Sequence, residues 1–212
     1  VLPFLKIHPT YMKKLLLLVF LVSFTVHSQI PAGYYDTAIG TGYTLKTQLH
    51  TIIQGHTDNG YTPGLWDTYQ TSDVDIHYEN DGTVLDMYSE VHSNDGDNTN
   101  DIDSYNFNFG PPDQDDGLGG ALEGERYNRE HIIPQSVFES VSPMRNDAHF
   151  IPPTDKKVNN VRSNYPHGMV GTATYISDNG SKLGSGLNSG YSAGYTGVVF
   201  EPIDEFKGDI AR

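Results

Sequence analysis

The sequence predicts an α+β fold, in which separate helices accompany short antiparallel strands. Three patterns support this prediction. Residues 44–56 repeat apolar side chains at helical spacing, and residues 73–90 alternate on both sides of the turn signal Asp81-Gly82. Residues 152–162 open with two prolines and a capping residue, as helices often do. A chain of 212 residues that is 36% hydrophobic fits one domain of ordinary size.

The first 28 residues are predicted to be absent from the folded protein. Lys13 and Lys14 precede a short apolar run, and a small-x-small pattern ends at Ser28, which is the layout of a secretory signal peptide. The apolar run is too short to span a bilayer, so we expect a secreted or periplasmic protein with no membrane anchor in its mature form. Residues 1–11 lie upstream of a natural start at Met12.

The mature domain is expected to begin near Gln29 and to occupy residues 29–212. Its first predicted helix, residues 44–56, places Leu45 and Leu49 on one face. A second, shorter helix is expected at residues 65–71 around the only tryptophan.

Strands are predicted where polar and apolar side chains alternate. They are residues 73–79, 83–90, 105–109 and 198–200. The glycine-rich residues 178–197 favour a loop or a loosely paired hairpin. A helix is beginning where the chain stops at Arg212, so we expect a domain that is truncated at its C-terminus.

Composition excludes several classes of site. The absence of cysteine excludes disulfides, thiolate metal sites and a cysteine nucleophile. A formal net charge of −14 excludes a broad basic surface. However, six of the 13 Lys and Arg residues fall within residues 126–162, and a polyanion would be attracted to that stretch.

The candidate chemistry lies in the same stretch. Glu130 and His131 are adjacent, and Pro134 indicates that a strand ends near them, where both side chains can serve one site. A carboxylate suits a hard cation such as Mg²⁺, and a histidine suits a general base at neutral pH. Asn159, about one turn into the predicted helix, offers an amide oxygen as a second ligand, and Arg162 follows on the same face.

Competing motifs fit less well. Residues 190–194 match G-x-S-x-G, but no histidine follows the serine as an α/β-hydrolase requires. The acidic residues 94–103 do not follow the standard calcium-loop pattern. Two alternatives stay open: a non-catalytic secreted calcium-binding or adhesion module, and a secreted glycoside hydrolase that uses paired acids.

Two segments resemble the endonuclease I family of secreted and periplasmic bacterial nucleases, which belongs to the His-Me finger (ββα-metal) group. They are residues 128–138 (NREHIIPQSVF) and 147–168 (DAHFIPPTDKKVNNVRSNYPHG). Residues 199–212 and the short segments LHTIIQGHT and LDMYSE are similar to the family as well. The resemblance implies a strand, loop, strand and helix around one divalent metal ion, with additional helices and a β-hairpin.

The resemblance also implies roles for individual residues. His131 matches the general base, and Glu130 and Asn159 match the metal ligands. Arg162 matches an arginine that is structural or contacts phosphate, and Arg145 is a candidate for stabilising the pentacovalent phosphate. Three residues are assigned supporting roles: Asn128, Arg129 and His149, the last as a brace of the metal loop.

The implied activity is hydrolysis of DNA, and often of RNA, with 5′-phosphate products. The implied cofactor is Mg²⁺, with Mn²⁺ or Ca²⁺ as substitutes. Nothing in the sequence resembles a recognition helix for the major groove, so we expect contacts to the phosphate backbone and little sequence specificity. We expect the protein to be a monomer.

Overall fold

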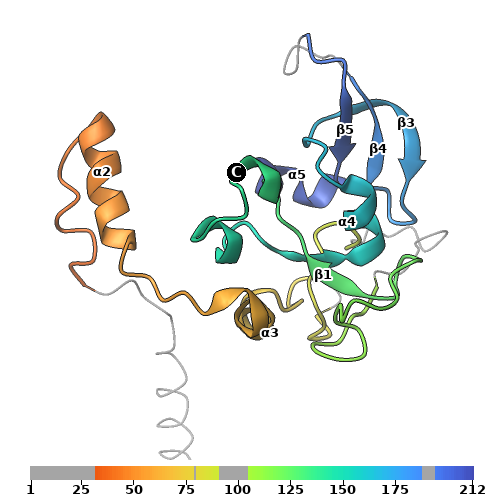
Figure 1. Cartoon of the computed structure of the whole chain (residues 1–212), viewed down its shortest axis with the longest axis horizontal. Coiled ribbons are helices and arrows are strands. Elements are labelled where there is room, and N and C mark those ends of the chain that lie inside the picture. The colour runs from red at the N-terminus through yellow and green to blue at the C-terminus, as the bar shows by residue number, and fades with distance from the viewer. Residues whose placement is uncertain (1–31, 79, 91–104, 188–193) are drawn as a thin grey trace, which may run out of the picture. The chain divides into compact units, whose positions relative to one another are not determined.

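The computed structural model describes residues 32–78, 80–90, 105–187 and 194–212 (Figure 1). The predicted signal peptide and the acidic loop at residues 94–103 lie outside these residues, as does most of the G-x-S-x-G match. The chain divides into two compact units, residues 1–57 and 58–212. Along the described ranges no helix is long and apolar enough to cross a membrane.

The described helices and strands form an α+β arrangement, as predicted. The helices are α2 (Gly42–Ile53), α3 (Leu65–Ser72), α4 (Lys156–Arg162) and α5 (Lys207–Ala211). The strands are β1 (Tyr127–Arg129), β2 (Pro153–Asp155), β3 (Val170–Ile176), β4 (Lys182–Gly186) and β5 (Val198–Glu201). Strands β1 and β2 pair antiparallel, and β3, β4 and β5 form a second antiparallel sheet in that order.

The first unit contributes α2, which confirms the predicted helix at residues 44–56. None of the residues of α2 is buried. Its apolar side chains, including the exposed Leu49 and Ile53, therefore do not form a core within the described part of this unit.

The second unit contains two clusters of buried hydrophobic side chains. One cluster joins α3 to β1 through Leu65, Trp66, Tyr69 and Tyr127, with further residues from the loops. The other consists of Tyr88, Val158 and Phe200. Strand β1 therefore packs on the first cluster and helix α4 on the second, so both cores hold the β1–β2–α4 elements in place.

The predicted hairpin at residues 73–90 is wrong in most of its length. The hairpin is formed only around the antiparallel bridge between Val74 and Val84, where the N–H of Asp75 donates to Thr83 and the N–H of Leu85 donates to Asp73, both at 2.9 Å; the described residues of this segment form no longer strand. The reason is Asp75, which is buried and accepts hydrogen bonds from the backbone N–H groups of His77, Tyr78 and Asn80. These bonds curl the chain into a loop, so its N–H groups are not offered to a strand ladder.

Residues 105–109 also form no strand, although Phe107 is buried as the alternation predicts. Strand β5 confirms the strand expected at residues 198–200, and α5 confirms the helix beginning near the end of the chain. Strand β3 was not predicted, whereas β4 lies within residues 178–197, where a loop or a loosely paired hairpin was expected, and pairs antiparallel with β3 and β5. Their three-stranded sheet is visible as the blue strands in Figure 1.

Candidate nuclease site

Strand β1 ends immediately before Glu130, which confirms that the Glu-His pair lies at a strand end. Strand β2 runs antiparallel to β1, with Arg129 opposite Pro153. Helix α4 follows β2 at once, because the carboxylate of Asp155 accepts a hydrogen bond from the N–H of Val158 at 2.8 Å and caps the helix. Thr154 and Asp155 could each cap the predicted helix, and the structure uses Asp155.

Asn159 lies against the end of β1. Its Nδ2 donates to Oδ1 of Asn128 at 2.7 Å and makes a longer contact of 3.5 Å with the carbonyl of Arg129. That carbonyl belongs to the peptide that joins Arg129 to Glu130, so the Asn159 amide and Glu130 are brought together. Both contacts use the nitrogen of the amide, which leaves Oδ1, the atom that ligates cations, for another partner.

Glu130 is 2% exposed and is held by two partners through the same oxygen. Oε1 accepts from Nη1 of Arg162 at 2.7 Å and from the hydroxyl of Tyr88 at 2.7 Å. Burial raises the pKa of Glu130 to about 7, against the lowering effect of Arg162 and Tyr88. A cation at Oε2 would favour the ionised form and offset this cost of burial.

His131 is 5% exposed, and its ring lies among Tyr61, Phe138 and Phe150. Nε2 lies 3.2 Å from the carbonyl oxygen of Arg145. A carbonyl can only accept a hydrogen bond, so Nε2 carries the proton and Nδ1 carries the free electron pair. Burial lowers the pKa of His131 and outweighs the raising effect of the bond to the Arg145 backbone, and the nearby arginines lower the pKa further, which favours the neutral ring at pH 7. A neutral imidazole with an oriented lone pair can act as a general base.

Arg162 is buried and has no surface to offer a phosphate, with a relative exposure of 2%. Besides Glu130, its guanidinium donates to the backbone carbonyls of His131, Ile132 and Tyr165 at 2.7, 2.6 and 3.1 Å. Of the two expected roles, this geometry supports the structural one and contradicts direct contact with phosphate. Arg162 therefore fixes the backbone that carries the side chains of Glu130 and His131.

Arg145 is exposed and lies next to His131, since its own carbonyl receives the bond from Nε2. Its guanidinium carbon is 5.0 Å from the ring centre of Tyr61. Arg145 is therefore an accessible cation beside the candidate base, as an anionic substrate requires.

The supporting residues divide into two groups. Asn128 contacts Asn159, and Arg129 stacks on Tyr61 and Trp66 at 3.7 and 4.2 Å, which packs it into the scaffold around the site. His149 is different, because its side chain is 97% exposed and pairs with Asp147. The structure gives His149 no bracing contact with the site.

Sequence reasoning missed Tyr88 and His167, which lie behind Glu130. Tyr88 bonds Glu130 directly, and Nε2 of His167 lies 3.0 Å from the Tyr88 hydroxyl. Tyr88 belongs to the LDMYSE segment and His167 to the PHG segment, so the similarity of both to the family was the available signal. Spacing offered none, because the two residues are 79 positions apart.

Comparisons with known proteins identify the family of the chain. The model of the endonuclease I family matches residues 41–212. Two curated relatives, both named extracellular ribonuclease, come from Bacillus subtilis (strain 168) and Bacillus amyloliquefaciens. They are 31% and 30% identical over 182 residues, which is 84% of this chain and 50% of each relative. The chain thus spans about half the length of these relatives. No solved structure gives a significant match.

The family match covers the whole second unit, with Glu130, His131 and Asn159 in it, and the chain belongs to the endonuclease I family.

Proposed function

We propose that this protein is a secreted, metal-dependent endonuclease that hydrolyses phosphodiester bonds of DNA and RNA with little sequence specificity. The observation that carries the proposal is the hydrogen bond from Nε2 of His131 to the Arg145 carbonyl, which leaves Nδ1 as a base. Family membership and the extracellular ribonuclease relatives support the same activity. The relatives' description as extracellular also supports export.

The β1–β2–α4 unit supports a His-Me finger arrangement. Strand β1 leads into the Glu130-His131 pair, a loop returns to the antiparallel strand β2, and α4 follows without a break. This order of strand, loop, strand and helix is what the resemblance implies. Asn159 on α4 contacts the end of β1, so the helix and the strand end face one site.

The donor set fits a hard divalent cation. Glu130 offers Oε2, since Oε1 is held by Arg162 and Tyr88, and Asn159 offers Oδ1. Within the described ranges no three His, Cys, Asp or Glu side chains are grouped to hold a metal ion. Mg²⁺ does not need such a group, because it keeps several waters and takes only one or two protein ligands.

The mechanism follows from where charge develops. The Nδ1 atom of His131 accepts a proton from a water that attacks phosphorus in line with the leaving 3′ oxygen. Glu130 and Asn159 would hold a divalent cation, which would supply Lewis-acid stabilisation of the developing negative charge. The guanidinium of Arg145 is exposed and positioned to pair with a phosphate oxygen. Contacts to phosphate carry no base identity, which is the reason for low sequence specificity.

The products on RNA test this mechanism. Because water is the nucleophile, we expect a 5′-phosphate and a 3′-hydroxyl on RNA as well as on DNA. An RNase that uses the 2′-hydroxyl as nucleophile gives 2′,3′-cyclic phosphates instead. End-group analysis of a labelled oligoribonucleotide separates the two, and cyclic phosphate ends would exclude water as the nucleophile.

Replacing Asn159 with alanine is expected to weaken metal binding. The change removes one of two proposed protein ligands, so the Mg²⁺ concentration at half-maximal cleavage should rise on the order of tenfold or more. Asn160→Ala is the matched control, because Asn160 is the next residue on α4 and is exposed. An Mg²⁺ titration of plasmid cleavage provides the measurement. An unchanged midpoint in Asn159→Ala would refute its role as a ligand.

A further inference from the structure

A series of two hydrogen bonds connects His167, Tyr88 and the Oε1 atom of Glu130. The hydroxyl of Tyr88 donates to Oε1 of Glu130 at 2.7 Å, and Nε2 of His167 lies 3.0 Å from that hydroxyl. A phenol has one proton to give, so once it is given to Glu130, His167 must be the donor to Tyr88. Every bond in the series His167, Tyr88, Glu130 therefore points toward the carboxylate. Bonds aligned in this way polarise and strengthen one another.

The protonation state of His167 agrees with this direction. Burial, together with the charge of Arg162, lowers the pKa of His167 to about 3, so its ring is neutral and carries one N–H. A neutral ring with one N–H is the state that this direction requires of His167.

Contacts with the surrounding structure fix both the ring and the backbone of Tyr88. Its ring is fully buried, with the ring centre of Phe200 at 4.8 Å. Its backbone N–H donates to Asp86 at 2.9 Å, and its carbonyl accepts from the Ser181 hydroxyl at 2.8 Å. The other oxygen of Asp86 accepts from the N–H of Asp155 at 2.8 Å, which ties the Tyr88 segment to strand β2.

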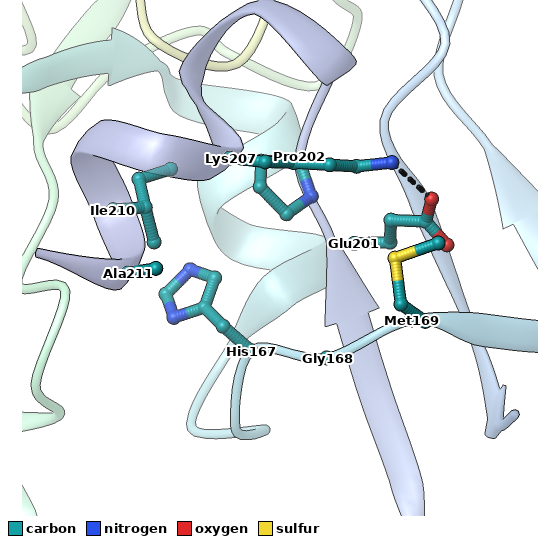
Figure 2. A pocket seen from close by; sticks show the side chains of 8 residues that line it. All are labelled: His167, Gly168, Met169, Glu201, Pro202, Lys207, Ile210 and Ala211. Atoms are coloured by element: carbon teal, nitrogen blue, oxygen red, sulfur yellow. Dashed lines mark hydrogen bonds and ion pairs between the residues drawn. The ribbon is translucent and has the colours of Figure 1, made fainter. Parts of the chain in front are cut away.

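His167 is placed by strand β5. It forms an isolated parallel bridge with Phe200, whose ring centre is 5.9 Å from that of the imidazole. The N–H of Phe200 donates to Pro166, and the N–H of Gly168 donates back to Phe200, both at 2.9 Å. Figure 2 shows the ring of His167 on the wall of a pocket, beside Ile210 and Ala211. His167 thereby connects strand β5 of the three-stranded sheet to Tyr88, which contacts Glu130 in the candidate metal site.

We propose that Tyr88 and His167 are positioning residues for the metal ligand Glu130. This inference rests on the proposed function, because it assumes that Glu130 binds the cation. Tyr88 and Arg162 occupy Oε1 together and fix the carboxylate, which directs Oε2 toward the cation as a single ligand atom. His167 fixes the Tyr88 hydroxyl. Partners of this kind orient a ligand before the metal arrives, and their loss typically costs ten- to a hundredfold in metal affinity or activity.

Packing alone does not require the oxygen of Tyr88. The ring contacts with Phe200 and the buried location would be retained by phenylalanine. Tyr88→Phe therefore keeps the packing of the ring and removes the two hydrogen bonds of the hydroxyl, one to Glu130 and one from His167. Tyr175→Phe is the matched control, because the Tyr175 hydroxyl donates to a different carboxylate, that of Glu123.

The test is Mn²⁺ binding to the protein without nucleic acid, measured by titration calorimetry. We expect Tyr88→Phe to bind Mn²⁺ about tenfold to a hundredfold more weakly, and the Mg²⁺ midpoint of cleavage to move in the same direction. Tyr175→Phe should bind as the unmodified protein does. Unchanged Mn²⁺ affinity in Tyr88→Phe would overturn the inference.

A second pair of variants tests whether His167 acts through Tyr88. His167→Leu should weaken Mn²⁺ binding, and His167→Gln, which retains a donor, should restore part of it. The double variant Tyr88→Phe/His167→Leu should bind Mn²⁺ as Tyr88→Phe alone does, since both act along one chain. Independent, multiplying losses would contradict the series. If Tyr88→Phe does not fold, His167→Leu and His167→Gln decide the question by themselves.

Glu130→Ala separates this inference from the proposed function. Loss of Mn²⁺ binding in Glu130→Ala with full binding in Tyr88→Phe would remove the positioning role and keep the metal site. Undiminished Mn²⁺ binding in Glu130→Ala would remove the metal site itself, and the inference with it.

Discussion

Replacing His131 with glutamine is expected to lower the rate of DNA and RNA cleavage by a factor of roughly 10² to 10⁴. The glutamine amide can still donate to the Arg145 carbonyl, but it has no basic nitrogen to accept the proton of water. His131→Ala should likewise abolish detectable nicking. Initial rates on a supercoiled plasmid and on a labelled RNA, at saturating Mg²⁺, provide the measurement.

The control for this prediction is His77→Ala, because His77 is an exposed histidine of the same unit that lies outside the candidate site. It should cleave at the unmodified rate. His131→Gln should also keep its Mn²⁺ affinity and its melting temperature, which separates loss of the base from loss of the site. Cleavage by His131→Gln at close to the unmodified rate would refute the assignment of the base.

Among the substitutions proposed for this protein, Arg162→Met is expected to lower the free energy of unfolding most. The variant leaves Glu130 buried without its charged partner and leaves three backbone carbonyls without their donor. Removing one partner of a buried ion pair typically costs about 3 to 5 kcal/mol in the free energy of unfolding. For a unit of this size that corresponds to a Tm lower by roughly 10 °C, measured by calorimetry or circular dichroism.

The cause of that loss can be tested by adding Glu130→Gln. Glutamine removes the uncompensated buried charge, so Arg162→Met/Glu130→Gln should unfold at a higher temperature than Arg162→Met alone. Each variant should fail to cleave nucleic acid, because each disturbs the proposed metal ligand. A double variant that is no more stable than Arg162→Met would show that the carbonyl contacts, and not the charge of Glu130, dominate the effect.

Local signals in the sequence predicted much of the candidate site. Two prolines followed by Thr154 and Asp155, either of which could cap a helix, predicted where α4 begins, and Asp155 forms the cap. Pro134 indicated a strand ending near Glu130, and β1 ends one residue before it. These features depend on a few neighbouring residues, so they can be predicted without knowledge of the tertiary structure.

Features that depend on distant residues could not be predicted in this way. The bond between Tyr88 and Glu130 joins residues 42 positions apart, and nothing in the local pattern of either indicates the other. The burial of Arg162 could not be predicted either, because its position three residues after Asn159 is the same whether its side chain is buried or exposed. The hairpin prediction failed after Asp75, whose buried carboxylate accepts from backbone N–H groups at residues 77, 78 and 80 that a strand ladder needs.

The most direct test of metal-dependent cleavage by His131 is to incubate the protein with supercoiled plasmid and with single-stranded RNA, in Mg²⁺ and in EDTA, beside His131→Gln. We expect Mg²⁺-dependent cleavage of both substrates, with 5′-phosphate ends, that is lost in EDTA and in the variant. Cleavage that persists in EDTA, or that His131→Gln carries out as well as the unmodified protein, would contradict a metal-dependent mechanism based on His131.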